Sequence, residues 1–533
     1  MPSRPHRPLR AIAQARSRTI ATVLALAAVA SAAAAGPVPI AGAAPYVPGV
    51  VVVKFAAHST REARAAAKRT SGTADVQEVG AFRLLRLTTH ASVTTTVDRL
   101  RRRPGVEYAL PDYIAHTDAR NPAAAPVLGS PGADQAVTPP STPPSARAAQ
   151  APPPSNPPAG SQPPPASQPP PANQPPPFIP NDPGRGTQPG GWQELQWNFL
   201  SPWGVNAPLA WAHVAAAGAP GGKGVTIAVL DTGVAYENRG PFRLSPDFTR
   251  DQFVPGYDFV GRTSHPDDHN GHGTHVAGTI AEATNNGYGL TGLAYGAKIM
   301  PVRVLDSRGE GDATNIARGV LYAVRHGAKV INMSLEFSSD VTAHMIPQLI
   351  NALAYAHHKG VFVAGASGNE GHASVAYPAR ARGVTAVGAT TEHGCLSDFS
   401  NDGRGLDMVA PGGGSDASLQ ADPDCHPVGP TGRDIFQITF AGTNPRHFGI
   451  PAGYEGTSMA APHVSATAAL IVASRVLGPN PSADAIAARL KATAHHLGRP
   501  GYNEDYGYGL IDAAAATDPS IPVGSGSLPT PSH

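Results

Sequence analysis

The most regular pattern in this 533-residue chain lies between residues 192 and 517, where continuous apolar runs alternate with helical patterns. The apolar runs are rich in Val, Ile and Ala, and they cover 224–230, 299–305, 330–335, 361–366 and 384–389. The helical patterns that intervene include 275–282, 315–326 and 346–358. Continuous apolar strands that alternate with helices predict a mostly parallel central sheet with helices on both faces, which is a three-layer α/β fold.

A smaller pattern occupies residues 46–116. Strand-like runs at 50–55, 82–87 and 106–110 alternate with helical stretches at 60–68 and 94–103. Strands and helices that alternate over so short a length predict a small α+β domain. We recognise no catalytic constellation in it.

Between these domains, residues 117–191 consist mostly of Pro, Ala, Ser, Gln and Gly. They contain repeats of Gln-Pro-Pro-Pro that begin at Gln162, Gln168 and Gln174. Such a segment buries too little apolar surface to offset its chain entropy, so we expect a disordered, Pro-rich linker. A ligand for an SH3-like domain is the alternative interpretation. The residues 518–533 are short, rich in Pro, Ser and Gly, and predict a disordered tail.

Several arginines at the N-terminus precede an Ala-rich apolar segment at 19–35. This order predicts a cleavable signal peptide at 1–35, and therefore a secreted protein whose association with a cell wall stays open. A membrane anchor is the competing interpretation. Because no second apolar span of about 20 residues follows, we expect no stable membrane span after signal cleavage.

Charge and cysteine content narrow the class of protein further. A net charge of +2 gives no sign of a nucleic-acid partner. Cys395 and Cys425 are the two cysteines, which excludes a disulfide-dense scaffold and any multi-thiolate metal site. In a secreted protein we expect one disulfide between them, and two free thiols are the alternative.

Three segments carry candidate chemistry. Asp231 follows the apolar run at 224–230, His272 precedes a helical pattern, and Ser458 precedes another. Each has an ordinary alternative: a turn-forming aspartate, a metal-binding pair made with His275, and a helix-capping serine. The zinc interpretation fails because zinc-binding histidines of this type stand four residues apart on a helix with a Glu between them. A serine at a helix N-terminus combines a hydroxyl that a base can activate with a free backbone N–H.

Three blocks, Asp231 to Gly233, His272 to His275 and Gly456 to Ala460, resemble the signature blocks of the subtilisin-like serine proteases (subtilases). They also follow that family's chain order of Asp, His and Ser. The resemblance covers about residues 192–516 and implies the subtilisin-like three-layer fold and a secreted serine endopeptidase.

The resemblance also implies a role for each residue of the triad. Ser458 would attack the scissile carbonyl, His272 would take and return its proton, and Asp231 would hold the imidazole in place. The segment 361–371 resembles the one that carries the family's oxyanion-hole asparagine, which here would be Asn369, acting with the Ser458 N–H. An ordinary turn is the alternative for Asn369.

The segment 330–337 resembles the family's substrate-pairing strand. The family's Ser-Leu-Gly-Gly is replaced by Ser-Leu-Glu-Phe, and with Glu370 nearby we expect a preference for basic or small side chains before the cleaved bond. A solvated surface carboxylate is the alternative for Glu336. The substrate-binding residues that the resemblance implies are Ser334, Leu335, Glu336, Ser367 and Gly368.

Residues 46–116 resemble the inhibitory prodomain of subtilases, which implies a zymogen whose own prodomain is an intramolecular inhibitor. An unrelated α+β module is the alternative. In the family the prodomain ends close to the mature start, whereas a long linker follows here, so the sequence does not place the processing site.

A structural calcium site is a further implication of the resemblance. Its side-chain ligands would be Asp247 and Asn286, and its N-terminal contributor is not recognisable. The chemistry itself needs no cofactor.

We therefore expect a monomeric, secreted endopeptidase that acts on proteins or peptides. A catalytically silent subtilase-fold binding protein, or a wall-associated protein, is the alternative.

Overall fold

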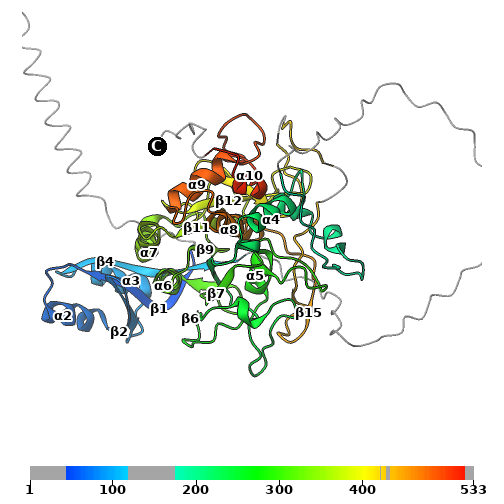
Figure 1. Ribbon diagram of the computed structural model, residues 1–533. Helices are drawn as coiled ribbons and strands as arrows, with labels where there is room; N and C mark the ends of the chain where they lie inside the picture. Colours follow the sequence, from blue (N-terminus) through cyan, green and yellow to red (C-terminus); the bar gives the residue numbers. More distant parts are fainter. Residues whose placement is uncertain (1–43, 118–173, 420–421, 428–431, 523–533) are drawn as a thin grey trace, which may run out of the picture. The chain divides into compact units, whose positions relative to one another are not determined.

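The computed structural model describes residues 44–117, 174–419, 422–427 and 432–522 (Figure 1). The predicted signal peptide and most of the predicted linker lie outside these residues. The described residues from Pro45 onward belong to one compact unit. No helix among the described residues has both the length and the apolar character that are needed to cross a membrane.

The predicted α+β fold is present, and its last strand ends at His116. Its helices carry capping residues: the Thr60 side chain accepts from the Ala63 N–H, and Gly72 closes the first helix with a positive φ of 65°. Antiparallel strands pair in the order β4-β1-β3-β2, and the helices cover a small apolar core. The elements are β1 (Tyr46–Phe55), α2 (Arg61–Ser71), β2 (Thr73–Val79), β3 (Phe82–Leu87), α3 (Val93–Arg101) and β4 (Val106–His116).

A seven-stranded sheet forms the centre of the larger domain, in the order β13-β12-β11-β9-β5-β7-β6. Every neighbouring pair in it is parallel, as the continuous apolar runs predict. The strands are β5 (Thr226–Asp231), β6 (Tyr257–Asp258), β7 (Lys298–Arg303), β9 (Val330–Met333), β11 (Phe362–Ala366), β12 (Thr385–Thr390) and β13 (Met408–Pro411).

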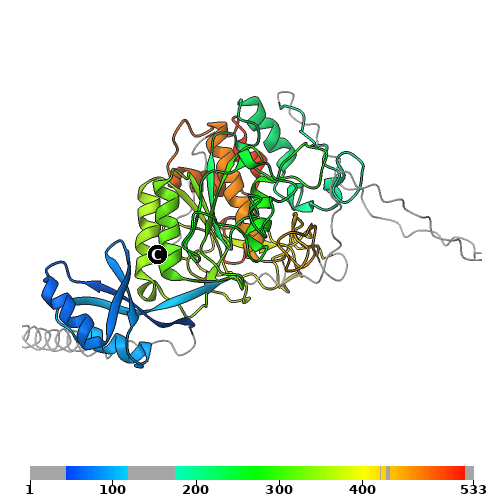
Figure 2. The same cartoon turned by 90° about the horizontal axis from the view of Figure 1, so that it is seen from below.

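Helices cover both faces of this sheet, so the predicted three-layer α/β architecture is confirmed. Figure 2 shows α8 (Thr457–Ser474) on one side of the strands and the pair α6 (Ala313–Arg325) and α7 (Pro347–His358) on the other. Helix α8 packs on β9, β11 and β12, and α5 (His272–Ala281) packs against α8. The remaining helices are α4 (Ala207–Ala216), α9 (Ala483–Ala492) and α10 (Ala513–Thr517).

Short elements complete the chain. Two strands, β8 (Glu310–Asp312) and β10 (Glu336–Phe337), pair with β4 of the α+β domain, and β14 (Thr439–Phe440) pairs with β15 (Phe448–Gly449). Single-turn 3-10 helices lie at Gly191–Glu194, Trp197–Phe199, Pro220–Gly222, Arg250–Gln252 and Ala343–Met345.

The segment 174–191, which we had assigned to the linker, packs on the large domain. The Phe178 ring contacts Trp211, and the Trp192 indole N–H donates to the carbonyl of Pro180. At the other end, Arg489 donates hydrogen bonds to the carbonyls of Asp518 and Ile521, in the predicted tail. These contacts extend the folded domain beyond both predicted boundaries, because aromatic and charged side chains anchor segments whose composition resembles that of a linker.

Cys395 and Cys425 form a disulfide with a Cα–Cα distance of 4.3 Å. It ties the segment after β12 to the long connection between β13 and α8. A closed loop of this size stabilises the fold by about 3 kcal/mol.

Candidate active site

Asp231 and His272 are hydrogen-bonded to each other at the edge of the sheet where the parallel strands end. The Asp231 carboxylate ends β5, is fully buried, and its Oδ1 lies 2.7 Å from Nδ1 of His272, the first residue of α5. The same oxygen accepts from the Thr232 N–H at 2.7 Å. Nε2 of His272 is buried and makes no hydrogen bond within the described part of the chain. This nitrogen is therefore free to act on a proton.

A second buried carboxylate, Asp268, holds the two motifs together, and the sequence analysis missed it. Its Oδ1 accepts from the Thr232 hydroxyl after β5 and from the Gly271 N–H before α5. Its Oδ2 accepts from both the N–H and the hydroxyl of Thr274. Asp268 is thus the acceptor for the N-terminal turn of α5, and it fixes His272 relative to Asp231. Its only sequence signal was its nearness to the His272 block.

The glycines of both motifs permit this close approach. A Cβ on Gly273 would lie 2.1 Å from the Gly233 carbonyl oxygen, and a Cβ on Gly233 would lie 2.4 Å from the Asp267 carbonyl oxygen. Gly233 also has a positive φ of 107°. Since neither neighbour is a movable side chain, only glycine fits at these two positions.

Ser458 is the second residue of α8 and lies next to Asn369. The Asn369 Oδ1 accepts from the backbone N–H and the hydroxyl of Thr457, at 2.8 and 3.0 Å. A Cβ built on Gly456 would lie 3.5 Å from Asn369 Oδ1 and 3.6 Å from the Ser458 nitrogen. The Asn369 side chain therefore lies beside the N-terminus of α8, and the backbone N–H groups at such a terminus favour negative charge.

Pro462 accounts for an unusual contact of this helix. Proline has no N–H, so the carbonyl of Ser458 lacks its usual donor four residues later. The Ser334 hydroxyl donates to that carbonyl instead, at 2.7 Å, and accepts from the Asn332 amide. Ser334 therefore satisfies the backbone of the candidate nucleophile, and its hydroxyl is not available to a substrate.

The other residues predicted to bind substrate line the same region. Leu335 is buried, the Ser367 hydroxyl donates to the Asn401 carbonyl, and the Gly368 N–H donates to the Thr457 hydroxyl. Glu336 is 1% exposed, so the solvated-surface alternative is wrong. Its Oε1 accepts from the Asn369 N–H at 3.1 Å and from Asn369 Nδ2 at 3.0 Å.

The end of the α+β domain lies between two strands of this site. Residues of β4 pair on one side with β10, where His116 faces Glu336, and on the other with β8, where Ala115 faces Gly311. The next residue, Thr117, donates its N–H to the Gly309 carbonyl at 3.0 Å. An extended peptide thus adds a strand beside β10, which is how a substrate could bind.

The predicted calcium ligands Asp247 and Asn286 lie together. Asn286 Nδ2 donates to Asp247 Oδ1 at 2.7 Å, and Asp182 accepts from the backbone N–H groups of Asn285 and Asn286. Asp182 stands in the segment that we had assigned to the linker, which is why the sequence analysis found no N-terminal contributor.

Burial raises the pKa of all three carboxyl groups in this region: Asp182, Asp247 and Glu282. Repulsion from Asp182 adds to the effect at Asp247, and repulsion from Asp247 adds to it at Glu282. Glu282 Oε2 has no hydrogen-bond partner within the described residues. No described group of three or more His, Cys, Asp or Glu side chains forms a metal cluster. Buried carboxylates that repel one another are nevertheless the hard oxygen ligands that a dication prefers.

Two buried histidines near the site have structural contacts. His275 stacks on Tyr454 and lies 2.9 Å from the Ile435 carbonyl, and burial lowers its pKa to about 3. His463 lies 2.8 Å from the Asn198 amide, and burial lowers its pKa to about 4. Both imidazoles are therefore neutral at ordinary pH, and His275 is part of the helix packing.

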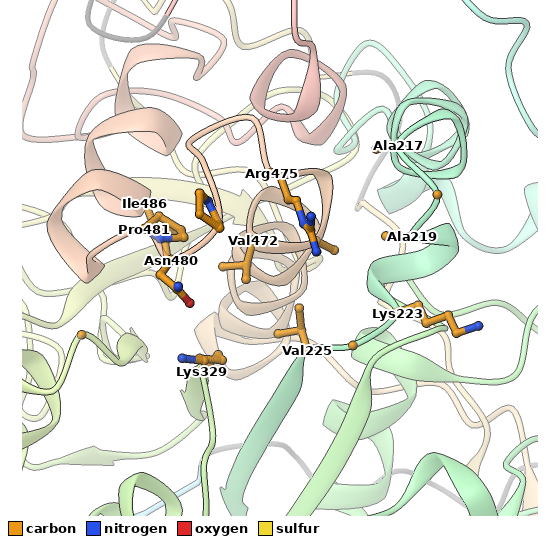
Figure 3. Close-up of a pocket in the computed structure, with 15 residues that line it drawn as sticks. Ala217, Ala219, Lys223, Val225, Lys329, Val472, Arg475, Asn480, Pro481 and Ile486 are labelled. Carbon is orange, nitrogen blue, oxygen red and sulfur yellow. The ribbon is translucent and has the colours of Figure 1, made fainter.

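A cavity of about 550 Å³ lies at the opposite edge of the sheet (Figure 3). It is lined by Val225 and Lys329, which precede β5 and β9, and by Arg475 after α8. None of the candidate catalytic residues contributes to it, so the chemistry belongs to the carboxyl ends of the strands.

Comparisons with known proteins agree with this geometry. The model of the subtilase family matches residues 222–509, which is more than half of the chain. The chain belongs to the subtilase family. Subtilisin Savinase from Lederbergia lenta is 37% identical over 319 residues, which cover 59% of this chain and 98% of the relative. A thermophilic serine proteinase from Bacillus sp. (strain AK1) is 39% identical over 251 residues, or 47% of this chain and 53% of the relative.

Solved structures show the same subtilase architecture. Proteases from Pseudoalteromonas arctica match with a TM-score of 0.51 and 32% identity, over 64% of this chain and 98% of theirs. Fervidolysin from Fervidobacterium pennivorans matches with a TM-score of 0.58 and 22% identity, over 90% of this chain and 62% of its own, and supports the fold alone.

The fervidolysin N-terminal prodomain model matches residues 32–112. This subtilase is therefore a serine-type endopeptidase that carries an N-terminal prodomain. The silent binding protein that we weighed as an alternative is not favoured.

Proposed function

We propose that this subtilase hydrolyses peptide bonds with Asp231, His272 and Ser458 as its catalytic triad. The observation that carries the proposal is the 2.7 Å contact between Asp231 Oδ1 and His272 Nδ1, which leaves the other imidazole nitrogen without a partner in the described structure. Asp231 fixes the tautomer in which Nε2 is the base, and it stabilises the imidazolium that forms.

In the reaction, Ser458 Oγ attacks the scissile carbonyl while His272 Nε2 takes its proton. The Ser458 N–H and Asn369 Nδ2 donate to the oxyanion of the tetrahedral intermediate. The imidazolium then returns the proton to the leaving amine, which gives an acyl-enzyme on Ser458. Water, with its proton taken by His272, releases the carboxylic acid product.

We also propose that residues 46–116 inhibit the enzyme by filling the substrate position. The pairing of β4 between β8 and β10 supports this, because that strand takes the place that a bound peptide needs. We further propose secretion, with residues 1–35 as a signal peptide, because the N-terminal pattern and the disulfide both suit an oxidising compartment.

A calcium ion would be held by Asp182, Asp247 and oxygens of the loop 284–290. It would offset the repulsion between the buried carboxylates and stabilise this loop. It would supply no step of peptide hydrolysis.

The triad is tested with Ser458→Ala in the full chain. We expect a folded protein with an unchanged far-UV circular dichroism spectrum and no measurable peptidase activity. Ser474→Ala, at the far end of the same helix, is the matched control and should keep full activity. If Ser458→Ala retained a substantial part of the activity, the proposed nucleophile would be wrong.

A further inference from the structure

The residue before the candidate base is a glycine, whose backbone has little conformational preference of its own. Gly271 precedes His272, the first residue of α5, and has a positive φ of 108°. Glycine adopts positive and negative φ about equally well, so its own sterics do not fix the peptide bond that joins it to His272. Contacts with neighbouring residues must fix that peptide bond, and with it the direction of the imidazole.

Two hydrogen bonds of this peptide bond are local. The His275 N–H donates to the Gly271 carbonyl at 3.1 Å. The His272 N–H donates to Asn270 Oδ1, also at 3.1 Å. These partners belong to the same turn and move with it.

A third hydrogen bond comes from a distant part of the chain. The Thr439 hydroxyl, at the start of β14, donates to the Gly271 carbonyl at 2.5 Å across a sequence separation of 168 residues. Thr439 is fully buried, so water does not compete for this bond. Thr439 therefore ties the turn before α5 to the rest of the domain.

Tyr454 connects the same glycine to the segment that precedes the candidate nucleophile. It lies four residues before Ser458, is buried, and stacks on His275 with a distance of 4.1 Å between the ring centroids. A Cβ built on Gly271 would lie 3.2 Å from Thr439 Oγ1 and 3.3 Å from the Tyr454 hydroxyl oxygen. The backbone that leads into α8 is therefore packed against the residue that leads into α5.

Contacts with β5 set His272 relative to Asp231, but the nucleophile lies on another helix. His272 begins α5, whereas Ser458 is the second residue of α8. The separation between His272 Nε2 and Ser458 Oγ therefore depends on how the segments before these two helices pack on each other. Thr439 and Tyr454 belong to that packing. A displacement of about 1 Å between reacting groups costs up to about 100-fold in rate.

Resting on the proposed function, we propose that Thr439 is a positioning residue of the reaction. Its hydroxyl fixes the peptide bond between Gly271 and His272, and thereby directs the imidazole toward the nucleophile. The two local hydrogen bonds remain when this hydroxyl is removed, so α5 keeps its first turn while the peptide bond can tilt. Because Thr439 is buried and does not contact the substrate, its loss should lower kcat rather than raise KM.

The first test is a pair of substitutions at Thr439, in protein produced from the full chain. Thr439→Ala removes the hydroxyl and the methyl group, whereas Thr439→Ser removes the methyl group alone. We expect Thr439→Ala to lower kcat by at least about tenfold with KM within about twofold, and Thr439→Ser to stay within about threefold of the wild-type kcat. A wild-type kcat in Thr439→Ala, or equal losses in the two variants, would overturn the inference.

Thr467→Ala is the matched control for a general loss of stability. Thr467 is also fully buried, and its hydroxyl donates to the His463 carbonyl within α8 at 2.9 Å. Urea unfolding should show that this variant is destabilised to a similar extent as Thr439→Ala, while its kcat stays at the wild-type value. If Thr467→Ala lowered kcat as strongly, the effect at Thr439 would be one of stability and the positioning role would be wrong.

The second test asks whether Thr439 acts through His272. In a His272→Ala background, the residual rate at which Ser458 reacts with a fluorophosphonate should change by less than about twofold on adding Thr439→Ala. A further tenfold loss in that background would assign Thr439 another role. If Thr439→Ala did not fold, Thr439→Val, which keeps the volume but lacks the hydroxyl, takes its place in every comparison with the same expected results.

Failure of this inference is distinguishable from failure of the proposed function. If Ser458→Ala abolishes cleavage but Thr439→Ala keeps the wild-type kcat, the triad stands and the role of Thr439 falls. If no peptide is cleaved in a Ser458-dependent way, the proposed function itself is wrong.

Discussion

Residues that the sequence analysis did not identify as functional hold the candidate catalytic residues of this subtilase in place. Asp268 accepts hydrogen bonds from both sides of the Asp231–His272 pair, and Thr457 donates to Asn369. The motif residues themselves could be predicted because glycines and small polar residues surround them at fixed positions. Their supporting contacts could not, since they join residues that are far apart in sequence.

Asp268→Asn tests this support at the level of one residue. In asparagine, an NH2 group, which is a donor, replaces one of the two carboxylate oxygens, which are acceptors. The Thr232 hydroxyl donates to Oδ1 of Asp268 and the Thr274 hydroxyl donates to Oδ2, so the substitution removes a buried hydrogen bond. We expect stability to fall by about 1–3 kcal/mol and kcat to fall by at least about tenfold, with a smaller change in KM. Urea unfolding and steady-state kinetics measure the two effects.

Asp251→Asn is the matched control, because Asp251 is exposed and lies outside the site. It should change neither quantity. An Asp268→Asn variant with wild-type kcat would show that this carboxylate does not position His272.

At the scale of elements, the apolar pattern predicted the buried strands best. β3 matches its predicted range, and β5, β7, β9, β11 and β12 lie within about two residues of theirs. β2 was missed because its residues alternate without an apolar run and its burial is partial. β4 extends beyond its prediction to His116, since Pro111 and Tyr113 pair with β1 and its last residues pair with β8 and β10. Local sequence cannot report such tertiary pairing.

The contact between β4 and α6 predicts that the stability of the uncleaved protein depends on pH. Burial, together with the charge of Asp312 at the start of α6, raises the pKa of Asp112 well above its usual range. Its other polar neighbours are the Thr314 N–H and the Gln348 amide. A carboxyl with a raised pKa contributes stability while it is protonated, and that contribution is lost as the pH rises above the ordinary carboxyl range.

We therefore expect the uncleaved Ser458→Ala protein to unfold at lower temperature at pH 8 than at pH 5. Asp112→Asn in this background should reduce that difference, because an amide does not titrate. Asp75→Asn, on an exposed part of β2, should leave the difference unchanged. Differential scanning calorimetry at the two pH values measures the melting temperatures. If the difference between them were the same in the parent protein and in Asp112→Asn, the attribution of the pH dependence to Asp112 would be wrong.

At the scale of the whole molecule, the sequence predicted a small α+β fold followed by a larger three-layer α/β fold, and the structure confirms both architectures. Contacts of Phe178 and Asp182 with the large domain lie within the predicted linker, because the Pro and Gly content of this segment resembles that of a linker. The contacts of Asp182 with the loop at 285–287 are visible only in three dimensions. They bring the N-terminal part of the domain to the candidate calcium site.

Removal of calcium tests this connection. We expect a chelator to lower the melting temperature by several degrees, because the repulsion between the buried carboxylates is then no longer offset. Asp182→Asn should make the melting temperature largely insensitive to the chelator, whereas Asp416→Asn, which lies outside the site and contacts His393, should not. If chelation left the melting temperature of the wild type unchanged, the proposed calcium site would be wrong.

The most direct measurement of the central claim is the mass of the protein after reaction with a fluorophosphonate, followed by peptide mapping. The account predicts one phosphonyl adduct per chain, located on Ser458, because the Asp231–His272 pair activates that hydroxyl alone. His272→Ala should remain folded and react at least about 1,000-fold more slowly. An adduct on another residue, or labelling at an undiminished rate in His272→Ala, would contradict the triad.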